Sequence, residues 1–470
     1  MTHRHPTQED PVVAGLSEAV GGPVGDHAGR HPWWTPRRVL LLLAAVVFAL
    51  GVVQKAPCSL GASEDTEATY AQMCYTDLRP LYIPRGFAEN AWPYSGDDQT
   101  RSRYEVMEYP VGISYWAWGT SWVTHWLVGS PDLDDRYAAA PSQLWGLDGM
   151  DAEITVFVLV NAVGFALLAL LTVWFLTGVS PGRPWDAAAF ALSPALALTG
   201  LINWDLIAVA LVAAALWAWT RERTVLTGVL IGLGVAAKLY PLFLLGGLLV
   251  LCLRRRRIAD FTTLLVTSFA AWLAANAPAY LTGREQWRVF WDFNAERGAD
   301  LGSLWLLVDQ ATDIGFAAGT INTWSWALFA LWCLGVFVLG MKAPEDPRLA
   351  QLGFLIVAGF LIINKVYSPQ YVLWLLPLAV LARPQWRDQL VWQGGELFYF
   401  AMVWWYLGGF LEPAGGGDAG FYWVAILVRV AAELYLVALV ARDVWRPEHD
   451  VVRSPRRQSE MTTRSTSVAV

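Results

Sequence analysis

The stretch ITVFVLVNAVGFALLALLTVWFL, Ile154 to Leu176, decides the fold class, because it is apolar over the full length that crosses a lipid bilayer. A hydrocarbon core about 30 Å thick is spanned by about 20 helical residues. Similar runs recur from Leu40 almost to the C-terminus of the 470-residue chain, which is 56% hydrophobic and 16% charged. The sequence therefore predicts an all-α polytopic membrane protein and excludes a set of soluble domains, whose surfaces need more charge.

The hydropathy pattern predicts about twelve transmembrane helices. They are expected at residues 39–53, 154–176, 185–202, 206–219, 225–237, 239–253, 262–280, 324–341, 349–363, 371–381, 390–409 and 422–440. Basic residues gather near the cytoplasmic ends of spans. Such clusters mark alternate ends of the predicted spans, at Arg37, Arg38, Arg221, Arg223, Arg254–Arg257, Lys342, Arg348, Arg383, Arg387, Arg442 and Arg446. We therefore expect both termini in the cytoplasm, with disordered tails at 1–36 and 443–470 around a transmembrane domain at 37–442.

The predicted topology makes residues 55–151 one long extracytoplasmic loop between the first two spans. Its ambiguous segment is ISYWAWGTSWVTHWLVG, Ile113 to Gly129, which is either an interfacial helix or a thirteenth span. A thirteenth span would invert the side of every later basic cluster. We therefore expect an interfacial helix that lies along the outer leaflet.

Cys58 and Cys74 both fall in this outer loop, where they are either a disulfide or two free thiols. Disulfides persist on the extracytoplasmic side. The sequence therefore predicts a disulfide that ties the start of the loop to the stretch after Cys74. Cys252 and Cys333 lie within predicted spans, where they are expected to pack as small apolar side chains.

Unusual polar residues gather at the predicted outer ends of the spans. They occur in NWD (Asn203–Asp205), KLYP (Lys238–Pro241), NKVYSPQY (Asn364–Tyr371) and the loop from Arg284 to Asp300. A single lysine at such a place either snorkels to the interface or binds an anion. Lys238 and Lys365, together with Arg284, Arg288 and Arg297, form a set that suits an anionic lipid headgroup.

Acidic residues of the outer loop are candidates for chemistry. In CYTDLRPLYIPRG, Asp77 is either a solvated loop carboxylate or a partly desolvated general base near the membrane surface. In YEVMEYPVG, Glu108 and Tyr109 are either positioned by the proline turn or begin a helix. Asp205 is expected to cap the helix that follows it.

Two further groups of charged residues favour structural roles. Arg429 and Glu433 lie four apart within the last predicted span, which predicts an intramembrane ion pair. The acids of PDLDD, Pro131 to Asp135, contain a DxD pattern that could bind a divalent metal, but this pattern occurs by chance in acidic loops. The sequence therefore predicts no metal site.

Five motifs in this order resemble the GT-C superfamily, and among its members the actinobacterial polyprenol-phosphate-mannose-dependent mannosyltransferases of glycosyltransferase family 87. They are YTDLRPLY, EYPVG, LINWDLIAVAL, GVLIGLGVAAKLYPLFLL and SPQYVLWLLPL, which together cover roughly Cys74 to Pro377. One departure is Val111, where the family commonly has a second proline.

The resemblance implies a GT-C fold and a plasma-membrane enzyme that moves a sugar, expected to be mannose, from a polyprenyl-phosphate donor. The acceptor would be a cell-envelope glycolipid or glycan on the extracytoplasmic face, with inversion, and with Asp77 as general base. Cofactors, metals and nucleic acid are not expected. The donor-site candidates are Lys238, Lys365, Arg284, Tyr82 and Gln370. The acceptor-site or supporting candidates are Glu108, Tyr109, Asn203, Asp205 and His125.

Two other function classes compete with the transferase. A lipid-linked-sugar flippase or transporter would favour ionisable residues at mid-membrane and internal repeats, and neither pattern is prominent here. A non-catalytic member of an envelope-assembly complex would keep the fold and tolerate the loss of Asp77.

Overall fold

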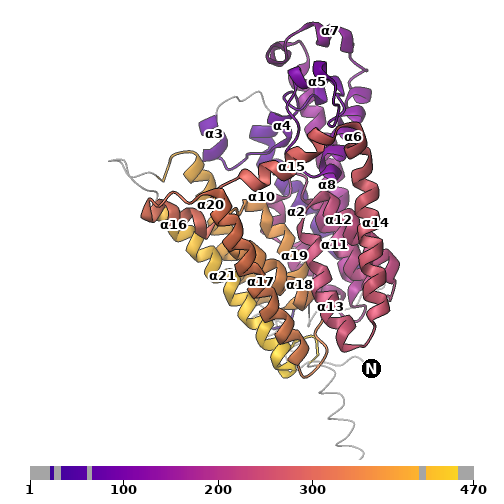
Figure 1. Ribbon diagram of the computed structural model, residues 1–470, viewed down its shortest axis with the longest axis vertical. Helices are drawn as coiled ribbons and strands as arrows, with labels where there is room; N and C mark the ends of the chain where they lie inside the picture. The colour runs from indigo at the N-terminus through magenta and orange to yellow at the C-terminus, as the bar shows by residue number, and fades with distance from the viewer. Residues whose placement is uncertain (1–21, 26–32, 61–65, 412–419, 454–470) are drawn as a thin grey trace, which may run out of the picture.

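The computed structural model describes residues 22–25, 33–60, 66–411 and 420–453. Most of both predicted tails therefore lies outside the described residues. The described part is built of helices and contains no strand, so the prediction of an all-α polytopic membrane protein is confirmed (Figure 1). At the C-terminal side, the fold continues past residue 442, because Asp450 is buried and accepts a hydrogen bond from Arg348 at 2.9 Å.

Five long apolar helices are long enough to cross a bilayer. They are α2 (Pro36–Ser59), α8 (Met150–Val179), α14 (Ile258–Thr282), α17 (Ala318–Lys342) and α21 (Gly420–Trp445). A helix of 25 residues is about 37 Å long, which exceeds the hydrocarbon thickness. In an apolar stretch of 18 residues in each helix, only 11% is buried in α14 and 17% in α17, so these helices present broad apolar faces suited to lipid.

Five shorter apolar helices form the interior. They are α11 (Leu206–Trp219), α12 (Thr224–Ala237), α13 (Leu244–Arg254), α18 (Leu349–Ile363) and α19 (Val372–Ala382). The short turns η5 (Tyr240–Phe243) and η6 (Pro369–Tyr371) lead into α13 and α19. A helix of 14 residues is only about 21 Å long, so these helices stop short of a full crossing. Their ends meet at one cavity.

The predicted span at 185–202 is wrong as a single helix. The segment consists of η4 (Pro184–Ala187), α9 (Ala188–Ala191) and α10 (Pro194–Thr199). Ser193 is extended, with φ −64° and ψ 122°, and Pro194 begins the next helix. A proline disfavours the helical conformation of the residue before it and donates no hydrogen bond, so the helix breaks there.

The outer loop folds into short helices around one longer one. They are α3 (Thr66–Ala71), α4 (Leu78–Leu81), η2 (Phe87–Glu89), α5 (Asp98–Arg103), α6 (Val111–Leu127), α7 (Leu133–Ala138) and η3 (Pro141–Gly146). A disulfide joins Cys58, near the end of α2, to Cys74. In Figure 1 these helices occupy the top of the view, with α5 and α7 highest.

Helix α6 packs against α8, and its predicted place along the outer leaflet stays a prediction. Trp116 of α6 donates to Asn161 of α8 at 3.1 Å, and His125 lies 3.3 Å from Glu153 near the start of α8. The two helices are therefore antiparallel neighbours. The reason is that Ser121, Thr124 and His125 are buried polar side chains that need partners inside the protein.

Two helices of the 284–312 loop were not predicted, α15 (Arg284–Glu296) and α16 (Leu304–Thr312). Figure 1 shows α15 running across the bundle above the short helices. The remaining long segment is α20 (Trp386–Leu407), which pairs with α21. The Arg429–Glu433 ion pair is confirmed, at 2.9 Å with both side chains buried.

The basic clusters that were predicted to be cytoplasmic lie at the ends of helices away from the cavity. Arg254 binds Asp346 at 2.8 Å, and Arg383 binds Asp443 at 2.7 Å. Many of these cations are paired with acids of neighbouring helices and loops. Their orientation toward the cytoplasm stays a prediction.

Candidate active site

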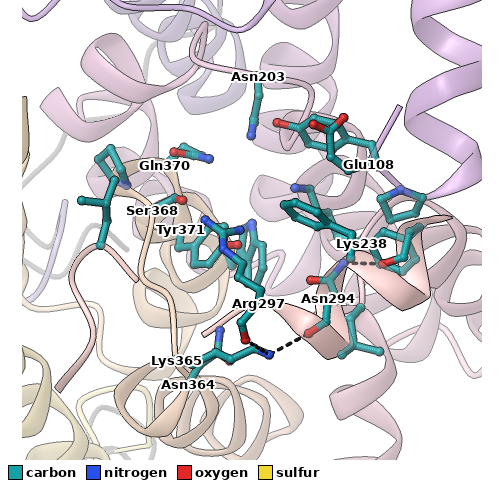
Figure 2. A pocket seen from close by; sticks show the side chains of 18 of the residues that line it. Glu108, Asn203, Lys238, Asn294, Arg297, Asn364, Lys365, Ser368, Gln370 and Tyr371 are labelled. Carbon is teal, nitrogen blue, oxygen red and sulfur yellow. Dashed lines mark hydrogen bonds between the residues drawn. The ribbon is translucent and has the colours of Figure 1, made fainter. Parts of the chain in front are cut away.

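One cavity of about 670 Å³ lies where the short helices end, beneath the outer loop and α15. Each predicted outward motif contributes to it, since Asn203 precedes α11, Lys238 follows α12 and Lys365 follows α18. The polar residues that line it are Asp77, Glu108, Asn203, Lys238, Asn294, Arg297, Asn322, Ser325, Asn364, Lys365, Ser368 and Gln370. Figure 2 shows Asn203, Gln370 and Arg297 extending into its open centre from different sides.

Asp77 is fixed at the cavity by its own backbone. Its N–H donates to the carbonyl of Ile202 at 2.8 Å, and the neighbouring Thr76 hydroxyl donates to Leu201 at 2.8 Å. The Tyr109 hydroxyl donates to the Asp77 carboxylate. Burial raises the pKa of Asp77 above its usual value, while hydrogen bonds from Tyr109 and Tyr75 and the nearby charge of Lys238 oppose that rise. The carboxylate is thus a stronger base than a solvated aspartate.

Lys238 is the cation whose charge acts on the Asp77 carboxylate. Its ammonium lies 2.8 Å from Asp205 and 4.8 Å from the centre of the Tyr109 ring. Asp205 does not line the cavity and also accepts from the Trp374 indole at 2.9 Å. Asp205 therefore holds Lys238 in place and makes no side-chain cap to α11, contrary to the predicted capping role.

Lys365 lines the cavity, but its ammonium is fully engaged. It donates to the carbonyls of Asn294 and Arg297 and to the Asn322 amide oxygen, each at 2.6 Å. An ammonium has three donors, and these contacts use all of them. Lys365 thereby ties the C-terminal end of α15 to α17 and α18, as the dashed lines in Figure 2 show for α15.

Arg297, at the C-terminal end of α15, points into the cavity (Figure 2). Its guanidinium lies 2.5 Å from Asp300 and is partly exposed. At the other side of the cavity, Glu108 accepts two hydrogen bonds of 2.8 Å from the buried Arg85. Arg297 and Glu108 therefore each reach the cavity as one partner of an ion pair.

Three predicted site residues lie elsewhere. Arg284 is at the opposite end of α15 and does not line the cavity. The Tyr82 hydroxyl donates to Glu153 at 2.7 Å, and His125 lies beside the same carboxylate. The structure thus places Tyr82 and His125 in a closed polar cluster between the outer loop and α8.

Aromatic side chains form much of the cavity wall, and the sequence did not single them out. The helices α15, α17 and α18 contribute a set of apolar lining residues, here called the apolar arm: Phe290, Trp291, Phe293, Trp326, Phe329, Phe360 and Ile363. Trp326, Phe329 and Phe360 pack against one another, with ring centroids 5.4 to 6.3 Å apart. Trp326 is 53% exposed and Trp291 40%, so this arm reaches the outside of the bundle. No sequence signal marks these residues, because the chain has 27 tryptophans and most predicted spans contain aromatics.

Among the described residues, no group of three or more histidine, cysteine, aspartate or glutamate side chains is placed to hold a metal ion. In the PDLDD stretch, Asp132 instead accepts from the backbone N–H of Asp134 at 2.9 Å at the start of α7.

The model of glycosyltransferase family 87 matches residues 138–369, about half of the chain. The matched part includes Asn203, Lys238, Arg297 and Lys365, whereas Asp77, Glu108 and Tyr109 precede it. No curated protein matches the chain.

Proposed function

The match to glycosyltransferase family 87 confirms the family resemblance and indicates a membrane glycosyltransferase, and on that premise we propose the reaction of this cavity. The proposed reaction moves a mannosyl group from a polyprenyl-phosphate donor to a glycolipid or glycan of the cell envelope. It takes place on the extracytoplasmic face of the plasma membrane.

Asp77 acts as the general base in this proposal. Its carboxylate takes the proton of an acceptor hydroxyl while that oxygen attacks the anomeric carbon of the donor sugar. The bond from this carbon to the phosphate oxygen breaks, and its electron pair leaves with the polyprenyl phosphate. Attack opposite to the leaving group inverts the anomeric configuration.

Arg297 and Lys238 hold the phosphate. A guanidinium and an ammonium in a partly desolvated cavity stabilise the charge that grows on the leaving phosphate. Arg297 points into the centre of the cavity, and Lys238 is kept in place by Asp205. Lys365 serves this site indirectly, because its three hydrogen bonds fix the backbone that carries Arg297.

The apolar arm receives the first isoprene units of the donor. Its walls come from α15, α17 and α18, and α17 is one of the long helices with a lipid-suited face. A lipid donor can enter sideways through such an arm and keep its remaining chain in the bilayer. The observation that carries the proposal is that one cavity joins this arm to the Asp77 carboxylate and to two cations.

The proposal is tested with the wild-type protein in lipid nanodiscs. Polyprenyl-phosphate mannose labelled in the sugar is supplied with an envelope lipid and glycan extract. We expect label to pass to an acceptor and polyprenyl phosphate to be released in equal amount, with glucose- and arabinose-linked donors as comparators for sugar choice.

Two outcomes would count against it. Label that crosses the membrane while still attached to its lipid would favour a flippase. An absence of transfer from all three donors, with folded protein, would favour a non-catalytic member of an assembly complex.

A further inference from the structure

The cavity has a second aromatic wall, formed by Tyr70, Tyr75 and Trp404. Tyr75 and Trp404 have ring centroids 5.3 Å apart, and Tyr70 lies 6.1 Å from Trp404 with its ring 17° from parallel. Tyr70 and Tyr75 are also stacked, at 6.3 Å. The three rings come from α3, α20 and the segment just before Asp77, so the wall adjoins the proposed base.

Trp404 makes a cation–π contact with a buried lysine, Lys55. The Lys55 ammonium lies 5.7 Å from the Trp404 ring centre and 5.5 Å from that of Phe400. Lys55 is 1% exposed and also donates to the carbonyl of Met73 at 2.9 Å. A cation over an aromatic face is attractive, so the wall is held in a fixed orientation.

Besides Nδ2 of Asn203, two buried polar atoms at the cavity have no partner among the described residues. The Nε1–H of Trp404 meets no acceptor, and Oε1 of Gln370 meets no donor. Trp404 is 4% exposed and Gln370 6%. Buried polar groups are nearly always paired, so these two atoms point to a ligand that carries both donors and acceptors. A sugar hydroxyl is both, whereas a polyprenyl chain is neither.

We propose, resting on the function proposed above, that the wall of Tyr70, Tyr75 and Trp404 binds the acceptor as a hexopyranose residue. The C–H face of the sugar packs on the rings, and its hydroxyl groups meet the Trp404 N–H and the Gln370 carbonyl. This places a neighbouring hydroxyl beside Asp77. The acceptor therefore carries a terminal pyranose at the site of transfer, and is not a bare lipid alcohol.

The location separates this site from that of the donor. Of the proposed donor site, Arg297 and the apolar arm belong to α15, α17 and α18, and Lys238 follows α12. The wall belongs to α3, α20 and the segment just before Asp77. Leu407, at the end of α20, also lines the cavity and is 36% exposed. The acceptor can thus enter past α20 while a donor occupies the apolar arm.

The test measures sugar binding without any transfer. The protein in lipid nanodiscs, free of donor, is mixed with methyl α-D-mannopyranoside, and saturation-transfer-difference NMR detects contact with the sugar protons. The methyl glycosides of glucose and galactose are run in parallel. We expect the signal from at least one glycoside to fall about threefold or more in Trp404→Phe, which keeps a ring but loses the N–H.

A second variant of the wall and a control variant outside the cavity accompany Trp404→Phe. Tyr70→Leu, at a partly exposed position, is expected to lower the signal as well, and covers the case in which Trp404→Phe is unstable. Trp126→Phe is the matched control, because Trp126 is 74% exposed on α6 and does not line the cavity. A wild type that binds none of the glycosides, or folded Trp404→Phe and Tyr70→Leu variants with the full signal, would overturn the proposal.

A competition arm separates acceptor from donor. Farnesyl-phosphate mannose is added to the complex with the methyl glycoside. Retention of the glycoside signal supports the acceptor site, and its displacement would overturn the proposal, because the wall would then hold the donor sugar. Glycoside binding by the wild type without any sugar transfer would refute the proposed function alone.

Discussion

Two carboxylate–tyrosine pairs involve the loop at residues 55–151, and they differ in what surrounds them. In the first, Tyr109 donates to Asp77, which borders the cavity. In the second, Tyr82 donates to Glu153 at 2.7 Å, and Arg136 binds the same carboxylate at 2.8 and 2.6 Å. Glu153 is 4% exposed and lines no described cavity.

The comparison shows what separates a reactive carboxylate from a structural one. Both pairs join a tyrosine hydroxyl to a carboxylate, and both are partly desolvated. Glu153 has its oxygens engaged by Arg136 and Tyr82, with His125 beside them, so it joins the outer loop to α8. Asp77 keeps a side open to 670 Å³ of space, where a substrate hydroxyl can approach.

The largest effect is expected at Asp77. Asp77→Asn keeps the shape and the Tyr109 contact but removes the base, so the rate of transfer should fall about a hundred- to ten-thousandfold. The rate of label transfer at matched amounts of folded protein measures this. Asp77→Glu, which keeps a carboxylate, should retain more activity than Asp77→Asn, and equal activity of wild type and Asp77→Asn would remove Asp77 from the mechanism.

The next effect is expected at Arg297. Arg297→Met removes a charged contact with the donor phosphate, which should raise the KM for the donor about ten- to a hundredfold. Arg284→Met is the control on the same helix, since Arg284 does not line the cavity. Similar donor KM values for the two variants would argue against a phosphate site at Arg297.

Glu153 should affect stability instead of rate. Glu153→Gln leaves the buried Arg136 without its anion, which typically costs about 3–5 kcal/mol. Thermal unfolding of the purified protein should therefore shift to a lower temperature, while kcat measured well below that temperature stays near the wild-type value. A variant with normal stability and lost activity would place Glu153 in the reaction.

The smallest effect is expected from removing divalent metals. In the proposed site a guanidinium and an ammonium neutralise the donor phosphate. EDTA should therefore leave the transfer rate unchanged. A loss of activity that Mg²⁺ or Mn²⁺ restores would show that the cations of the protein are not sufficient.

The sequence predicted the membrane fold and much of the cavity for a physical reason. Polar residues at the outer ends of spans are costly unless they meet a common wet or ligand-filled space. Asp77, Asn203, Lys238 and Gln370 therefore converge there. Pro194 is a local signal for a helix break, but the continuous apolar pattern of residues 185–202 led to the prediction of a single span there.

The remaining assignments depend on tertiary partners that local sequence does not encode. Tyr82 and Tyr109 are tyrosines of the same loop, and only the fold pairs one with Glu153 and the other with Asp77. Arg284 is the first residue of α15, and Arg297 directly follows its last residue, about 20 Å away. Arg297 therefore lines the cavity and Arg284 does not.

The central claim is that Asp77, whose carboxylate borders the cavity, is the general base. The pH dependence of transfer tests this claim most directly. A base works when ionised, so kcat/KM should fall as the pH drops through the pKa of Asp77, which burial raises above its usual value. Tyr109→Phe removes a hydrogen bond that favours the ionised carboxylate, so the acidic limb should move to higher pH, whereas Tyr82→Phe should leave it in place. An acidic limb that stays fixed in Tyr109→Phe, or moves equally in Tyr82→Phe, would contradict the account.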